Sequence, residues 1–249
     1  MAAKRSVPKD LVSSKTNNTI YQLKISLEEI GPLIWRRVLV PSQIRLSDLH
    51  SIIQCVMPWT ESHLHQFVVD GKFYGVPSEN EDDYGLEETL NEKSVTLSEI
   101  APTAKSGFYY EYDFGDSWIH NVEVEKVLAI DPKLPYPVCI DGAGCAPPED
   151  CGGACGYEEL LETLSNRKNS EYEEMKDWAE ASLGHKFDPK LFDLKRINKL
   201  LSAKVKLSKS LISGTLTEKQ LAQKQLVGAK AGAAKKRGLK ESQARRGGH

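Results

Sequence analysis

The feature that most restricts the fold of this chain is a pair of aromatic and β-branched segments separated by a glycine turn. Residues 108–114 and 118–127 have this composition, and Gly115-Asp116 lies between them. Such segments around a short glycine-containing turn predict an antiparallel β-hairpin. A second hairpin is predicted over residues 62–75, because Asp70-Gly71 is a dipeptide that favours tight hairpin turns.

Further strands and helices are predicted outside these hairpins. Apolar and polar residues alternate over 21–27, and an apolar run occupies 33–40, which predicts two more strands. Apolar residues at helical spacing predict a helix over 48–57 that ends at Pro58. Three later helices are predicted over residues 157–164, 170–183 and 189–200. The expected fold class is therefore α+β, with antiparallel hairpins packed on a helix and a helical C-terminal part.

The net charge of −2 is the sum of two regions with opposite sign. Residues 201–249 carry twelve Lys or Arg and two Glu, a charge of +10, so residues 1–200 carry −12. We expect a flexible arm over 1–18, an α+β domain over 19–203 and a basic, disordered tail over 204–249. A tail of this charge would contact nucleic-acid phosphates without sequence preference. The alternative is a tail that only increases the solubility of the protein.

The cellular setting is also constrained by composition. No apolar run approaches the roughly 18 to 20 residues that a membrane span needs. Residues 1–6 are charged but no apolar stretch follows them, so they do not resemble a secretory signal. We therefore expect a cytoplasmic protein with no membrane partner.

Two histidines in the first predicted hairpin could share a metal ion. His63 and His65 stand at i and i+2, which places both side chains on one face of a strand. Two imidazoles at this spacing can bind Zn²⁺. The alternative is that they form ordinary structural hydrogen bonds.

The turn of the second hairpin carries more polar residues. Asp113 and Asp116 flank the glycine, where aspartates commonly accept hydrogen bonds from nearby backbone amides. His120 lies between apolar residues of the predicted strand, so a buried imidazole there needs a polar partner. Asp116 or a metal ion would supply it.

Residues 131–156 are predicted to form a long loop rich in Pro, Gly and Cys, while 77–93 form an acidic loop. Four thiols fall within 17 residues of the first loop and could bind zinc, although none has the C-x2-C spacing that signals structural zinc strongly. They are Cys139, Cys145, Cys151 and Cys155. A tight capping loop with incidental cysteines is the alternative.

Four strings in this order resemble one family. They are Ile34-Trp35-Arg36-Arg37, Trp59-x3-His63-Leu64-His65-Gln66-Phe67, Tyr112-Asp113-Phe114-Gly115-Asp116-x-Trp118-x-His120 and Pro147-Pro148-Glu149-Asp150-Cys151-Gly152-Gly153-x-x-Gly156-Tyr157. The chain is similar in them to the plasmid pRiA4b ORF-3-like family, also labelled insertion-element passenger proteins. The resemblance covers roughly residues 18–200 and leaves out the arm and the tail.

The resemblance implies a compact α+β domain of unsettled biochemistry, often found near mobile elements. It also implies that the cysteines at 145, 151 and 155 are variable in the family. The polar residues that match the family strings are His63, His65, Asp116, His120, Glu149 and Asp150.

Three functional hypotheses follow. The first, which we favour from the sequence, is a binding or accessory protein whose basic tail contacts nucleic acid. The second is a metal-dependent enzyme in which His63, His65 and His120, with Asp116 or Glu149, hold a divalent ion that activates water. The third is that pairs such as His63–Asp116 or His120–Glu149 only brace the fold. No Walker phosphate loop, Rossmann glycine fingerprint or G-x-S-x-G elbow is present to favour other common chemistries.

Overall fold

A computed structural model describes residues 19–31, 33–77 and 89–212, with side chains as far as residue 205. The predicted arm and the predicted tail beyond residue 212 lie outside the described residues. The chain divides into two compact units, Met1–Ser202 and Ala203–His249. The candidate site and the cavity described below belong to the first unit.

The first unit is organised around a mixed eight-stranded sheet. Its strands lie in the order β5-β4-β3-β6-β7-β1-β2-β8, and only β4 and β5 pair in parallel. The strands are β1 (Thr19–Leu27), β2 (Trp35–Pro41), β3 (His65–Val69), β4 (Lys72–Gly75), β5 (Thr89–Asn91), β6 (Gly107–Tyr112), β7 (Trp118–Ala129) and β8 (Val138–Ala143). The helices are α1 (Leu46–Val56), α2 (Leu97–Ile100), α3 (Gly153–Ser165), α4 (Tyr172–Leu183) and α5 (Leu194–Ile212). The predicted α+β fold class is confirmed.

Both predicted hairpins are present. Strands β6 and β7 pair from Gly107 opposite Glu123 to Tyr112 opposite Trp118, and the glycine turn connects them. Strands β3 and β4 form the other hairpin around Asp70-Gly71, both of which adopt positive φ. Local turn chemistry was enough to predict these two elements.

Two strands were missed in regions predicted as loops. Strand β8 lies inside the loop predicted over 131–156, and β5 lies inside the acidic loop predicted over 77–93. Neither segment alternates in hydrophobicity, because each is an edge strand of the sheet and takes its backbone partners from β2 or β4. Such pairing is a non-local property that periodicity does not report.

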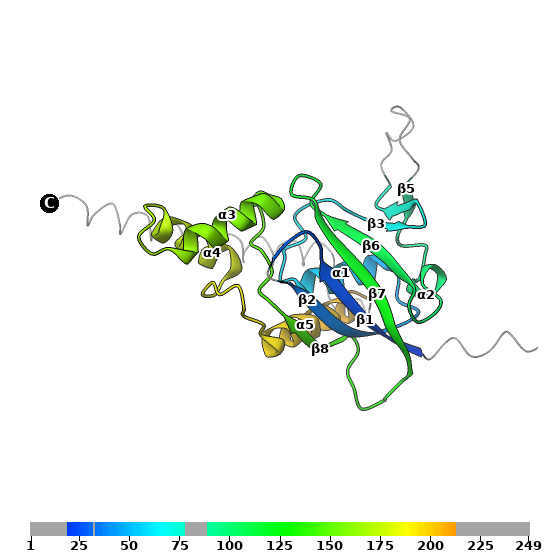
Figure 1. The fold of residues 1–249 in the computed structure, drawn as a ribbon. Helices are drawn as coiled ribbons and strands as arrows, with labels where there is room; N and C mark the ends of the chain where they lie inside the picture. Colours follow the sequence, from blue (N-terminus) through cyan, green and yellow to red (C-terminus); the bar gives the residue numbers. More distant parts are fainter. Residues whose placement is uncertain (1–18, 32, 78–88, 213–249) are drawn as a thin grey trace, which may run out of the picture. The chain divides into compact units, whose positions relative to one another are not determined.

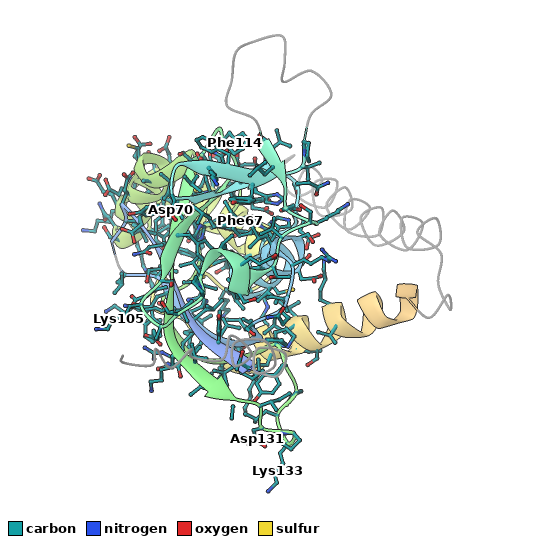
Figure 2. The ribbon with its side chains drawn as sticks, turned by 90° about the vertical axis from the view of Figure 1, so that its right-hand side faces the viewer. Phe67, Asp70, Lys105, Phe114, Asp131 and Lys133 are labelled. Atoms are coloured by element: carbon teal, nitrogen blue, oxygen red, sulfur yellow. The ribbon has the colours of Figure 1, made fainter. Side chains whose placement is uncertain are left out.

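The core fills the space between one face of the sheet and α1. Figure 1 shows α1 lying against the sheet behind the long strands β1 and β7. Buried side chains from β1 and β7 meet the apolar face of this helix, and Phe67 of β3 lies among them. Figure 2 shows Phe67 inside the packed side chains, whereas Asp131 and Lys133 project from the tip of the connection between β7 and β8.

Helix α5 covers the outer edge of β8. The side chain of Asn198 accepts a hydrogen bond from Cys139 N at 2.9 Å and donates one to Cys139 O at 2.8 Å. These bonds substitute for a neighbouring strand and protect an edge that would otherwise be free to pair. The helix begins at Leu194 rather than at residue 189 as predicted, because Asp193 caps it by accepting from Arg196 N at 2.9 Å. Within the ranges that the structure describes, no helix is both long and apolar enough to cross a membrane.

Candidate functional site

Three loops meet at one end of the β6–β7 hairpin. The loop after α1 contacts the loop before α3 through Trp59, whose indole Nε1 donates to Pro147 O at 3.0 Å. It contacts the hairpin turn through Leu64, whose carbonyl accepts from Asp113 N at 2.8 Å. The fold therefore assembles three of the four family-like strings in one place.

His63 lies at the centre of this junction. Its Nδ1 is 3.4 Å from Asp113 Oδ2, and its Nε2 is 3.3 Å from Asp150 Oδ1. One ligand atom from each of the three residues lies within 4.8 Å of the others, and no second group of this kind occurs among the residues that the structure describes. The two short distances start from different nitrogens of the His63 ring, and one ion binds only one of them, so it is the 4.8 Å grouping that places all three residues within reach of a single ion.

The three side chains differ in exposure. The exposed fraction is 27% for the side chain of His63, 12% for Asp113 and 75% for Asp150. An ion held here would be anchored from the protein side by His63 and Asp113. Its remaining coordination positions would face solvent, as in catalytic rather than structural metal sites.

The backbone of the hairpin turn fixes the Asp113 carboxylate. Asp113 has a φ of 60°, and its Oδ1 accepts from Gly115 N at 3.0 Å and from Asp116 N at 3.4 Å. This bond pattern is the turn role that the sequence suggested. It uses only one oxygen, so Oδ2 remains directed toward His63.

The loop that carries Asp150 is held tightly against the same turn. Gly152 N donates to Asp116 Oδ2 at 3.3 Å. Gly153 has a φ of 67°, and a Cβ atom there would lie 2.5 Å from the Asp116 carbonyl oxygen. Asp150 itself has a φ of 60°, a conformation that costs free energy in a non-glycine residue and that clusters at functional sites.

Glu149 joins the loop after α1 to the end of strand β6. It is not a member of the group formed by His63, Asp113 and Asp150, which is called the ion group below. Its Oε1 accepts from the Tyr112 hydroxyl at 2.5 Å and from Thr60 N at 3.1 Å, and its Oε2 accepts from Thr60 Oγ1 at 2.6 Å. Burial, followed by the neighbouring carboxylate, raises the pKa of Tyr112 well above its ordinary value. Tyr112 therefore stays protonated and serves as a donor, and Glu149 acts as a brace.

His65 lies in a separate buried cluster. Its Nε2 is 2.8 Å from Glu92 Oε2, and its ring stacks on His50 with a centroid distance of 3.5 Å. His63 precedes β3, whereas His65 is the first residue of the strand, so the two rings do not share a strand face.

His120 is fully buried and faces backbone. Its Nδ1 lies 3.0 Å from Trp118 O and 3.3 Å from Tyr110 O, so this nitrogen carries the proton and donates. Burial lowers the pKa of His120 to about 4, which keeps the ring neutral at neutral pH. Its Nε2 has no hydrogen-bond partner among the described residues.

The suggested bracing pairs His63–Asp116 and His120–Glu149 are replaced by other partners. His63 faces Asp113 and Asp150, and Asp116 accepts from a backbone amide. Glu149 is satisfied by Thr60 and Tyr112, and His120 by carbonyl oxygens.

The cysteine loop does not form a metal-sized cluster. None of the five cysteines forms a disulfide bond, and no three of them lie together as metal ligands in the described ranges. Burial raises the pKa of Cys139 and Cys145 to about 11 and that of Cys151 to about 12. These thiols therefore remain protonated at neutral pH, which disfavours both metal binding and nucleophilic attack.

The structure also places a cavity beside the ion group that sequence reasoning missed. It has a volume of about 330 Å³, and Asp150 lines it together with residues of α3 and α4. The apolar residues of these helices were predicted only as core faces, because nothing in a helical repeat reveals that two helices leave a gap. Their glutamates carried no sequence signal at all.

Comparisons with known proteins identify relatives of this chain. The family model described as "Plasmid pRiA4b ORF-3-like protein" matches residues 19–196. The uncharacterized protein y4hQ of Sinorhizobium fredii (strain NBRC 101917 / NGR234) is 34% identical over 165 residues, which cover 66% of this chain and 82% of that protein. A crystal structure of a protein of unknown function, MM3350 from Methanosarcina mazei Go1, is 38% identical with a TM-score of 0.62. The match covers 72% of this chain and 98% of the chain in that crystal structure.

Proposed function

The chain belongs to the plasmid pRiA4b ORF-3-like family, and from its own geometry we propose that it is a metal-dependent protein that binds one divalent ion through His63, Asp113 and Asp150. The observation that carries this proposal is the convergence of one imidazole and two carboxylates within 4.8 Å. Each residue comes from a different loop, so the group depends on the tertiary fold.

The ligand chemistry favours a divalent transition-metal ion. Imidazole suits Zn²⁺, Fe²⁺ and related ions, and carboxylate oxygen extends the range to Mn²⁺. Two carboxylates balance the double charge of the ion, and the charge of −12 on residues 1–200 further favours a cation. Turn amides that bind Asp113 Oδ1 orient this ligand, as outer-shell hydrogen bonds do in established metal sites.

The open side of the group suggests catalysis. Asp150 is largely exposed and borders the cavity of about 330 Å³, so water and a ligand could reach the ion together. A divalent ion in such a position lowers the pKa of bound water and polarises a ligand oxygen. The chain would thereby perform a metal-assisted hydrolysis or a related transfer.

Metal analysis of the untagged full chain tests this proposal. We expect about one ion per chain by mass spectrometry after incubation with Zn²⁺ or Mn²⁺ and dialysis. His63→Ala and Asp150→Asn should each lower the affinity by about tenfold or more. Asp131→Asn makes the same chemical change at the distant tip shown in Figure 2, and should leave the affinity unchanged.

One result would contradict metal binding by His63, Asp113 and Asp150. If no ion is retained and chelator leaves the unfolding temperature unchanged, these three residues serve only to brace the loops. Loss of stability without loss of metal in the His63→Ala variant would lead to the same conclusion.

A second proposal concerns the basic C-terminal region. Its charge of +10 supports contact with nucleic-acid phosphates, although it lies largely outside the described residues. Replacing Lys235, Lys236 and Arg237 by Gln in the full chain should weaken duplex DNA binding and reduce its salt dependence, measured by fluorescence anisotropy. If the variant and the wild type bind DNA with equal affinity at every salt concentration, these residues do not contact nucleic acid and this second proposal is refuted.

A further inference from the structure

The cavity beside Asp150 is bounded by two helices and the loop before them. Helix α3 contributes one wall and α4 the other, and the segment around Asp150 closes one end. The lining residues that matter for a ligand are Asp150, Glu159, Leu160, Glu171, Met175 and Trp178. Its volume of about 330 Å³ falls at the lower end of the range for small-molecule sites, which fits a ligand of amino-acid size.

The charged residues of this cavity all have the same sign. Asp150, Glu159 and Glu171 line it, and among the residues with described side chains no Lys, Arg or His does. In the part of the chain that is described, neither glutamate forms an ion pair. All three carboxylates are exposed, so water weakens their mutual repulsion, and a cation that enters the cavity would be attracted by all of them.

The remaining lining favours an organic cation over a hydrated metal ion. Trp178 offers an indole, which is the best side chain for cation–π attraction. Met175 and Leu160 add polarizable and apolar surface that would contact an alkyl stem. A metal ion with its hydration shell would gain nothing from these three side chains.

We propose that this cavity binds the cationic end of the ligand, a guanidinium or primary ammonium on a short alkyl stem. The cationic head lies against Trp178 between Glu159 and Glu171, and the stem contacts Met175 and Leu160. This inference deepens the proposed function and rests on it in one respect, namely that the other end of the ligand reaches the ion.

Asp150 supplies the connection between the two parts of the site. Its Oδ1 is 3.3 Å from His63 Nε2, and the same residue lines the cavity. A ligand anchored at Trp178 would therefore direct its far end toward the ion group. Binding energy from the cationic end would position the reacting end, which is the general use of remote contacts in catalysis.

The cation site can be tested without any metal. Butylguanidinium and its neutral isostere butylurea are titrated into the chelator-treated full chain by calorimetry. We expect butylguanidinium to bind at least about tenfold more tightly than butylurea, and to lose about tenfold in Glu159→Gln/Glu171→Gln and in Trp178→Leu. The matched control is Glu158→Gln/Glu162→Gln, two glutamates of α3 that do not line the cavity, and it should bind like the wild type.

The connection to the ion is tested separately. A probe that joins guanidinium by an alkyl stem to a metal-binding hydroxamate should bind more tightly than butylguanidinium only when Zn²⁺ is loaded, and His63→Ala should abolish that gain. If butylguanidinium and butylurea bind equally, or if the glutamate and tryptophan variants bind like the wild type, the cation site is refuted. If the cation binds but the hydroxamate gains nothing while metal is present, the two parts do not form one site. If no metal binds at all, only the proposed function fails.

Discussion

The buried imidazole of His120 should make the stability of this protein fall as the pH is lowered below about 6.5. The ring is fully buried and its pKa is lowered from 6.5 to about 4, chiefly by desolvation. In the unfolded chain the same ring takes up a proton near pH 6.5. Protonation therefore favours the unfolded state throughout the window between these two pKa values.

The sign and size follow from proton linkage. Above pH 6.5 both states are neutral, and the full stability is present. Between about pH 6.5 and 4 the unfolded state binds one more proton, so the free energy of unfolding falls by about 1.4 kcal/mol for each pH unit. Lowering the pH from about 7.5 to about 5 should cost about 2 kcal/mol, and the total loss below pH 4 should be about 3 kcal/mol.

Urea denaturation of chelator-treated protein at several pH values measures this effect. His120→Gln has no titrating ring. Between pH 7.5 and 5 it should therefore lose about 2 kcal/mol less unfolding free energy than the wild type loses. Comparing slopes cancels the constant destabilisation that the His120 substitution itself causes.

One result would refute the reasoning. If wild type and His120→Gln lose the same free energy over this pH range, the ring is not held neutral in the folded state. A second variant, His120→Phe, guards against an artefact of the glutamine side chain, because it too lacks a titrating group.

Two further predictions concern the loops that position the candidate site. Gly153→Ala should lower the free energy of unfolding by about 2–4 kcal/mol, since its Cβ would meet the Asp116 carbonyl oxygen at a positive φ, whereas Gly31→Ala, with open space around it, should cost far less. Tyr112→Phe removes a hydroxyl that donates to Glu149 and should cost about 1–2 kcal/mol in the same urea assay, and an unchanged stability would show that this bond is not formed in solution.

The sequence predicted those elements whose signals are local. The turn at Gly115-Asp116 and the aromatic runs beside it were sufficient for the β6–β7 hairpin, and helical spacing was sufficient for α1. Strand β8 escaped prediction because its stability comes from β2 on one side and Asn198 of α5 on the other. Both partners are distant in sequence.

Most residues of the candidate site were also named from the sequence, but their grouping was not. Spacing placed His63 beside His65, whereas the chain enters β3 only at His65 and leaves His63 in the preceding loop. His63 therefore turns toward Asp113 and Asp150 instead.

What the sequence determined by itself is the fold class, the main hairpins and helices, the family and the chemical types available for a site. These depend on periodicity, turn residues and ordered motifs, which are properties of neighbouring residues. Only the tertiary structure decided which candidates meet, because a metal-sized group requires side chains from three loops to converge to within a few ångströms. The cavity next to Asp150 was likewise decided by the packing of α3 against α4, and no pattern along either helix records the space between them.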